Sequence, residues 1–318
     1  MYVLELEKPV AALRSKIEEL RALMDAGNLE SGSEIAKLEA KAKQLEEEIF
    51  KNLDNWDKTQ LARHPFRPCT LDFVQHCTKD FQELHGDRHF RDDPSIVGGF
   101  CRIDGTRFML IGHQRGRTTT ENVHRNFGMP HPEGYRKALR LMKLAEKFGV
   151  PILTLIDTKG AYPGLGAEER GQSEAIAVNL REMAGLTVPV ICVVIGEGGS
   201  GGALALGVGN RVLMLEHSIY SVISPEGCAS ILFGDSSRAQ EAARSLKYVA
   251  KDLLKLKVID GFVPEPVGGA HAKPEEALDS LKKAVLKHLG QLEKLSAEQL
   301  IQGRYEKFRQ MGVFAESV

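Results

Sequence analysis

The sequence predicts an α/β protein built as a spiral of ββα units, with a helical hairpin at the N-terminus and a helical C-terminal region. Two apolar segments, residues 152–156 and 190–195, each follow a Val-Pro pair and are each followed by a loop and a helical pattern. Nearly continuous apolar strands that alternate with helices are typical of parallel strands buried on both faces. Strand pairs precede the helices, which favours a coil of ββα units over a flat βαβ sheet.

Residues 1–60 are expected to form the hairpin, because apolar residues recur there every three or four positions in two runs. These runs are Val10, Leu13, Ile17, Leu20 and Met24, then Ile35, Leu38, Ala42, Leu45 and Ile49. Gly27 and Asn28 interrupt the pattern, and Ser31 with Glu34 fits a capping box. One apolar seam per helix indicates a coiled-coil-like pair. The seam fits contact with another subunit and packing onto the main domain equally well.

The main domain is predicted to span residues 61–296, beginning with a linker over 61–68 that contains two prolines. The predicted strands are 100–103, 108–112, 152–156, 190–195, 211–215 and 218–223, and the predicted helices are 134–148, 167–183, 202–207 and 225–232. The first two strands are joined by Asp104-Gly105, a dipeptide typical of a tight hairpin turn. The last part of the chain is expected to be helical, with residues 297–318 as a separate tail.

The composition narrows the function classes. Lysine and arginine number 42 against 43 acidic residues, so the chain lacks the basic excess typical of a nucleic-acid binder. No two of the five cysteines form a Cys-x-x-Cys pair, so no zinc ribbon is expected and no metal ligand is assigned in this chain. Widely spaced cysteines and an N-terminus unlike a signal peptide favour a cytoplasmic location. No apolar run approaches the ~20 residues that span a bilayer, so no membrane partner is expected.

Residues 196–202, Gly-Glu-Gly-Gly-Ser-Gly-Gly, follow a predicted strand and open a predicted helix. Gly196, Gly198 and Gly201 fit the dinucleotide-binding fingerprint, and Glu216 lies about twenty residues further on, as that motif requires. That fingerprint usually occupies the first strand–helix unit of its domain, whereas a similar unit precedes this one. The isolated match is therefore weak.

The same segment also fits the Gly-x-Ser-x-Gly nucleophile elbow around Ser200. Asp235 or Asp260, followed by His271, would supply the remaining members of a hydrolase triad in the expected chain order. Those three residues fall in polar, helix-rich sequence, and no oxyanion motif of the His-Gly-Gly-Gly type lies upstream. A small serine in a tight turn is the simpler interpretation.

A third interpretation uses the backbone. Paired glycines allow a close approach and leave N–H groups exposed at a helix N-terminus, where the helix dipole adds positive charge. Such donors suit an oxyanion formed in acyl or carboxyl transfer. Residues 157–164 occupy the equivalent position after the preceding strand. Since neighbouring parallel strands end at the same edge of a sheet, the two loops are expected to face one crevice and to hold one oxygen from two sides.

A series of long, ordered motifs resembles the α subunits of bacterial acetyl-CoA carboxylase carboxyltransferases, which belong to the crotonase superfamily. The motifs lie at residues 83–88, 126–129, 132–138, 157–164, 167–172, 196–203, 221–229 and 264–266. The likeness covers the chain from about Phe81 to His271. The family usually has proline where Lys159 stands, and tryptophan followed by lysine near Phe233-Gly234.

The resemblance implies a crotonase-like fold and a set of partners. A β subunit would carry a zinc ribbon, bind acetyl-CoA and complete an α2β2 tetramer. Carboxybiotin would donate its carboxyl group to acetyl-CoA. The biotin would be attached to the biotin carboxyl carrier protein, and biotin carboxylase would be a further partner. The product would be malonyl-CoA, in the first committed step of fatty acid synthesis. Biotin itself would act as the base, so none of the ten histidines is needed for that step.

The resemblance assigns the amides that bind the biotin ureido oxygen to Gly201 and Gly202. It places further residues around the substrate: Gly198, Gly199, Gly160, Ala161 and Tyr162. Glu169 and Arg170 are expected to be structural ion-pair residues. His113, Arg115 and Arg117 follow a predicted strand and are interpreted as a solvated basic loop.

Two other function classes stay open from the residues alone. An enoyl-CoA hydratase or isomerase would use the same fold and amide pair, with Glu197 or Glu226 as its carboxylate. A non-catalytic scaffold would explain the hairpin and the charged tail, but not two aligned loops of the oxyanion type.

Overall fold

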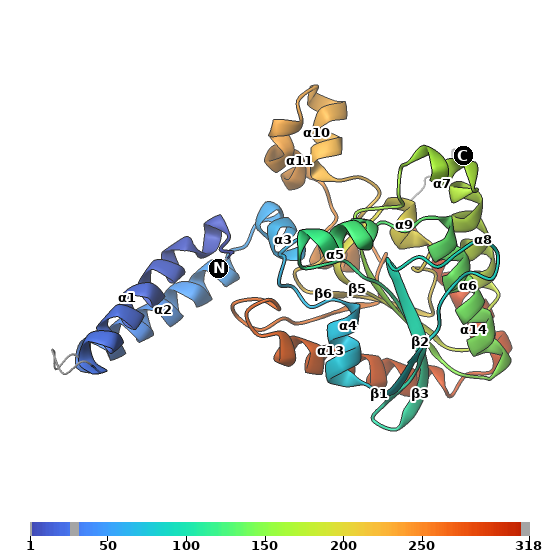
Figure 1. Ribbon diagram of the computed structural model, residues 1–318, viewed down its shortest axis with the longest axis horizontal. Coiled ribbons are helices and arrows are strands. Elements are labelled where there is room, and N and C mark those ends of the chain that lie inside the picture. Colours follow the sequence, from blue (N-terminus) through green and yellow to red (C-terminus); the bar gives the residue numbers. More distant parts are fainter. Residues whose placement is uncertain (1, 26–31, 313–318) are drawn as a thin grey trace, which may run out of the picture.

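The computed structural model describes residues 2–25 and 32–312, and its centre is one mixed β-sheet (Figure 1). In these residues the eight strands are β1 (Lys79–Glu83), β2 (Ile96–Ile103), β3 (Thr106–His113), β4 (Ile152–Thr158), β5 (Val190–Gly199), β6 (Arg211–Leu215), β7 (Ile219–Ser221) and β8 (Gly261–Val263). Their order is β1-β2-β3-β4-β5-β6-β8, with β7 paired to the end of β5. The first three strands are antiparallel, and the pairs from β3 to β8 are parallel.

Helices surround this sheet. They are η1 (Glu5–Glu7), α1 (Lys8–Asp25), α2 (Gly32–Lys51), α3 (Asn55–Ala62), α4 (Thr70–Cys77), α5 (Thr119–His124), η2 (Asn126–Gly128), α6 (Pro132–Lys147), α7 (Leu165–Glu169), α8 (Gln172–Ala184), α9 (Ser200–Leu204), α10 (Pro225–Phe233), η3 (Ser236–Arg238), α11 (Ala239–Ser245), α12 (Ala250–Lys255), α13 (Pro274–Leu292) and α14 (Ala297–Arg309). In the described part of the chain, every helix is too short or too polar to cross a lipid bilayer.

The sheet is buried on both faces, as its continuous apolar strands predict. Along β4, Ile152 and Ile156 belong to a core formed with α6 and α8, whereas Leu153 and Leu155 belong to a second core formed with α4 and α13. This alternation follows from the two-residue period of a strand. Cys192 of β5 is fully buried, and burial raises the pKa of its thiol to about 11, so it serves as a small apolar residue.

The predicted hairpin between β2 and β3 is confirmed. Ile103 pairs with Thr106, which leaves Asp104 and Gly105 as a two-residue turn. Both turn residues have positive φ, 45° and 85°, as the favoured two-residue hairpin turns require. This turn fixes the register of the antiparallel end of the sheet.

The N-terminal helical hairpin is also confirmed, and Figure 1 shows α1 and α2 projecting side by side away from the sheet. Ile17, Ile35 and Ala42 form a small core between the two helices that is separate from the cores of the sheet. Arg14 and Glu46 are joined across it by an ion pair of 2.8 Å. The predicted breaks at Gly27-Asn28 and the capping Ser31 lie outside the described residues.

Four predicted segments are corrected. The loop predicted over 196–202 is strand as far as Gly199, because Gly198 pairs with Thr158 on one side and with Tyr220 on the other. The helix predicted over 202–207 is therefore α9, which begins at Ser200 and ends at Leu204. The strand predicted over 218–223 is only the three residues of β7. The helix predicted over 167–183 is divided into α7 and α8, because Gly171 between them has a left-handed φ of 82°.

The predicted linker over 61–68 is wrong. Its first two residues end α3, and Arg67 is 1% exposed, with its guanidinium paired to the buried Glu265 carboxylate. This segment is held inside the fold, where the carbonyl of Ile195 in β5 accepts a 2.6 Å hydrogen bond from Arg67 Nε.

Candidate active site

The loops that follow β4 and β5 are in backbone contact. A Cβ atom added to Gly199 would lie 2.1 Å from the Lys159 carbonyl oxygen, and one added to Gly202 would lie 2.6 Å from the Ala161 nitrogen. Carbon atoms in ordinary contact lie about 3.5–4.0 Å apart, so only glycine allows the loops to approach so closely. The two loops that the sequence predicts to share one crevice are thus brought together.

Three backbone amides are left free where the loops meet. Gly201 and Gly202 lie in the first turn of α9, where amides have no partner within the helix. Across the described residues, neither amide donates a hydrogen bond, and neither does the amide of Ala161. The amide of Gly160 differs, since it donates to Thr158 Oγ1 at 3.1 Å. Of the two amides predicted on the β4 loop, only that of Ala161 is available to a ligand.

Tyr162 lies at the edge of this site and is half-buried. Its ring meets the His131 ring edge-on, with centroids 4.1 Å apart, and a Cβ added to Gly164 would lie 2.4 Å from it. Its amide donates to Pro130, and its carbonyl accepts from Gln172 Nε2. These contacts hold the β4 loop against α6 and α8.

Two buried residues lie behind the loops, and sequence reasoning missed their place. Tyr135 of α6 puts its hydroxyl 2.9 Å from the position of a Gly202 Cβ atom, and burial raises the pKa of that hydroxyl well above its usual range. His113 ends β3 and is fully buried. Burial lowers the pKa of His113 to about 3, although the nearby carbonyl groups of Gly202 and Leu155 act in the opposite direction. It is therefore a neutral core residue.

The solvated basic loop predicted around His113 is accordingly wrong. Arg115 is largely buried, with its Nε 3.0 Å from Asp157 Oδ2, and it donates to the carbonyl groups of Arg63 and His64 at the end of α3. Arg117 alone lies at the surface, paired with Asp72. Arg170 is a structural ion-pair residue, as predicted, and its partner is Glu133.

The carboxylates nearest to the site are already engaged. Arg63, at the end of α3, binds Glu197 of β5 and Glu226 of α10, each at 2.7 Å. Burial opposes ionisation of Glu226, but the Arg63 guanidinium outweighs it, so the pKa of this carboxyl is lowered. Neither carboxylate is free to act as the acid or base of a hydratase.

The geometry also excludes the hydrolase triad. Ser200 has an exposed side chain and a left-handed φ of 51°, but its hydroxyl has no hydrogen bond to any described residue. Asp235 caps η3, Asp260 pairs with Lys307, and His271 pairs with Glu7. These candidate partners are held in other parts of the fold.

The dinucleotide interpretation is likewise not supported. Two of the three glycines that match it, Gly196 and Gly198, lie in β5, where Gly198 is paired on both sides, so this part of the segment is not a phosphate-binding loop. Glu216, the proposed ribose ligand, accepts a hydrogen bond from the Glu265 amide instead.

Comparison with known proteins identifies the family of this chain. The profile of the family described as acetyl co-enzyme A carboxylase carboxyltransferase-like matches residues 3–312. Relatives named acetyl-coenzyme A carboxylase carboxyl transferase subunit alpha include one from Geobacter metallireducens, 59% identical over 315 residues and covering 99% of both chains. Another, from Geobacillus sp., is 60% identical over 314 residues and covers 99% of this chain and 97% of the relative.

Solved structures of the same fold share little sequence. The β subunit of geranyl-CoA carboxylase from P. aeruginosa has a TM-score of 0.56 at 18% identity, over 77% of this chain and 46% of that one. A Pseudomonas malonate decarboxylase hetero-tetramer in complex with coenzyme A has a TM-score of 0.54 at 17% identity, over 67% and 85%. The chain spans less than half of the geranyl-CoA carboxylase subunit. These structures confirm the crotonase-like fold.

The fold and the family match together define a crotonase-like carboxyltransferase. The chain belongs to the acetyl-CoA carboxylase carboxyltransferase family, and the relatives reported above are its α subunits. The resemblance drawn from the ordered motifs is confirmed, and the hydratase and scaffold alternatives are set aside.

Proposed function

We propose that this chain forms the α-subunit half of a site that transfers a carboxyl group from carboxybiotin to acetyl-CoA, giving malonyl-CoA for fatty acid synthesis. The observation that carries the proposal is the set of free amides on Ala161, Gly201 and Gly202, where two loops meet in backbone contact. Glycine is required there for the approach, and free amides at a helix N-terminus suit an oxygen that gains negative charge.

These amides fit the ureido oxygen of biotin, because that oxygen becomes more negative as the carboxyl group departs. Gly201 and Gly202 donate from α9 and Ala161 from the facing loop, while Gly198, Gly199 and Gly160 set the spacing. Tyr162 lines the slot for the bicyclic ring. When bound, carboxybiotin supplies both the carboxyl group and a basic nitrogen for proton removal. A neutral, buried His113 is consistent with a chain that provides no base of its own.

The other half of the site is assigned to a partner. We propose a β subunit with a zinc ribbon that binds acetyl-CoA, in an α2β2 tetramer served by the biotin carboxyl carrier protein and biotin carboxylase in the cytoplasm. Large apolar side chains beside the loops support a protein partner, since Val222 is 80% exposed and Leu165 is 75% exposed. We retain the division into a hairpin (1–60), a carboxyltransferase domain (61–296) and a tail (297–318).

Reconstitution tests this function. Malonyl-CoA is expected to form from carboxybiotin and acetyl-CoA only when the chain is mixed with a zinc-ribbon β subunit. The chain alone is expected not to hydrate crotonyl-CoA, and hydration by the purified chain would restore the hydratase alternative.

The Ser200→Ala variant separates the backbone from the side chain. It keeps every amide of the site, so carboxyl transfer in the reconstituted enzyme should stay within about twofold of the wild-type rate. A loss of two orders of magnitude or more in a folded variant, comparable to removal of an oxyanion donor, would return Ser200 to the role of nucleophile.

A further inference from the structure

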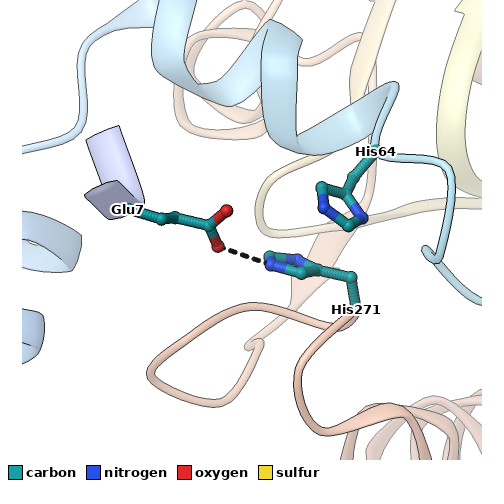
Figure 2. Close-up of side chains that lie close together, drawn as sticks. All are labelled: Glu7, His64 and His271. Atoms are coloured by element: carbon teal, nitrogen blue, oxygen red, sulfur yellow. Dashed lines mark hydrogen bonds and ion pairs between the residues drawn. The ribbon is translucent and has the colours of Figure 1, made fainter. Parts of the chain in front are cut away.

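Three ionisable side chains that do not belong to the two loops meet at the junction of the helical hairpin and the main domain. Figure 2 shows the carboxylate of Glu7 and the imidazoles of His64 and His271 facing one another. Glu7 belongs to η1, His64 follows α3, and His271 lies in the connection from β8 to α13. One potential ligand atom from each residue lies within 4.8 Å of those of the other two.

The cluster is enclosed and incompletely paired. Glu7 Oε1 lies 2.6 Å from His271 Nε2, and the two imidazole rings lie 3.9 Å apart between centroids. His64 is 2% exposed, and its Nε2 atom has no hydrogen bond of ordinary geometry to a described residue, although the backbone of Tyr2 lies near this ring and acts to raise its pKa. Its Nδ1 atom accepts from the Phe66 amide at 3.2 Å. A buried ring nitrogen without a partner requires an explanation, since such groups cost about 1–3 kcal/mol when left unpaired.

We propose that Glu7, His64 and His271 form a zinc site that fastens the start of the helical hairpin to the main domain. Two imidazoles and one carboxylate are a ligand set that Zn²⁺ uses in proteins, with water in the fourth position. Zinc bonds to nitrogen and oxygen are about 2.0–2.2 Å long, which places tetrahedral ligand atoms about 3.4 Å apart. The 2.6 Å contact between Glu7 and His271 must open by about 0.8 Å, and the two imidazole rings, now 3.9 Å apart between centroids, must turn so that one nitrogen of each faces the metal.

Burial and neighbouring groups act on both side chains. Burial would raise the pKa of Glu7, but the hydrogen bonds with His271 and with the Leu4 amide, together with the charges of the two histidines, outweigh it, so the pKa of Glu7 is lowered. Burial, reinforced by the neighbouring His271, lowers the pKa of His64 to about 4. The geometry of the cluster, and not these shifts, carries the proposal.

One hydrogen bond must be exchanged. To bind zinc through Nε2, His64 moves its proton to Nδ1 and gives up the bond from the Phe66 amide. Water would then have to accept the hydrogen bond from the Phe66 amide. The sequence could not reveal this site, because its ligands lie 57 and 207 residues apart and follow no zinc-binding spacing.

Metal titration of the full chain, expressed without any partner and stripped with a chelator, tests the proposal. We expect one Zn²⁺ per chain by calorimetry and an increase in Tm when zinc is added. His64→Ala and His271→Ala should each weaken binding at least tenfold. His85→Ala is the matched control, because His85 lies 3.1 Å from Asp92 and 3.7 Å from Glu83 but is exposed, and it should leave binding unchanged.

Two further measurements apply if the histidine variants fail to fold. Glu7→Gln keeps a hydrogen-bond acceptor for His271 but removes the charge, so it should fold, bind zinc more weakly and lose most of the zinc-induced rise in Tm. Co²⁺ bound to the wild-type chain should give the visible absorption of a tetrahedral nitrogen–oxygen site without a thiolate charge-transfer band, which excludes the five free cysteines as ligands. Absence of stoichiometric binding, binding unaffected by Glu7→Gln, or a thiolate band would each overturn the proposal.

Discussion

Adding a single methyl group at Gly202 tests the contact between the two loops. In the Gly202→Ala variant the new Cβ atom would lie 2.6 Å from the Ala161 nitrogen and 2.6 Å from the Gly160 carbonyl carbon. Both neighbours are backbone atoms, so relief requires the loops to separate by roughly 1 Å to reach ordinary contact. A displacement of this size at a catalytic site costs about 10²-fold in rate, and complete loss of one oxyanion donor costs about 10²–10³-fold.

The assay is malonyl-CoA formation by the enzyme reconstituted with its β subunit. We expect kcat to fall about 10²-fold or more, and further in Gly202→Val. The free energy of unfolding should fall by only about 1–3 kcal/mol, as for other overpacked sites. Gly303→Ala is the control, because no atom lies within 4 Å of its added Cβ on α14. A folded Gly202→Ala enzyme with kcat within about threefold of wild type would refute the oxyanion assignment.

Two further predictions concern the buried charges beneath the site. Arg63→Gln leaves the carboxylates of Glu197 and Glu226 without the cation that they share. The free energy of unfolding, measured by urea denaturation, should therefore fall by about 1–3 kcal/mol. An unchanged denaturation midpoint would contradict a stabilising role for these two ion pairs. Burial alone would raise the pKa of the Glu265 carboxyl, but the Arg67 guanidinium outweighs it and the pKa falls to about 2. This folded-state pKa lies below the value of about 4.3 for an unfolded chain, so the Arg67–Glu265 ion pair stabilises the protein at pH values above about 4.3. The stabilisation is on the order of 3 kcal/mol. That contribution should disappear as the pH falls from about 5 to 2, and Glu265→Gln should flatten this part of the stability profile, measured by denaturation at several pH values.

Local patterns predicted much of the fold. The apolar runs of β4 and β5 and the Asp104-Gly105 turn are set by neighbours in the sequence, and the structure contains them. The end of β5 was missed because Gly198 and Gly199 pair with β7, a strand about twenty residues further on, and glycine itself has little preference for strands. The break at Gly171 was missed, since glycine also occurs inside helices.

The site, like the fold, was predictable only where neighbouring residues in the sequence determine it. Parallel order alone implies that the loops after β4 and β5 meet. The parallel order does not show that the Gly160 amide donates its hydrogen bond to Thr158 Oγ1. It also does not show that His113 is buried beneath Gly202. A histidine and two arginines after a strand indicate a basic surface, but long-range pairs with Asp157 and with the end of α3 place Arg115 inside the fold. Such contacts join segments that no local pattern connects.

The two outer strands of the sheet bear on how the protein avoids self-association. β1 carries Lys79, Asp80 and Glu83 and is mostly exposed, while β8 at the other margin is only three residues long. Charged or very short outer strands are poor templates for the backbone pairing that starts aggregation. Copies of this chain at high concentration are therefore not expected to join their sheets, and the surfaces left for specific assembly are those of its loops and helices.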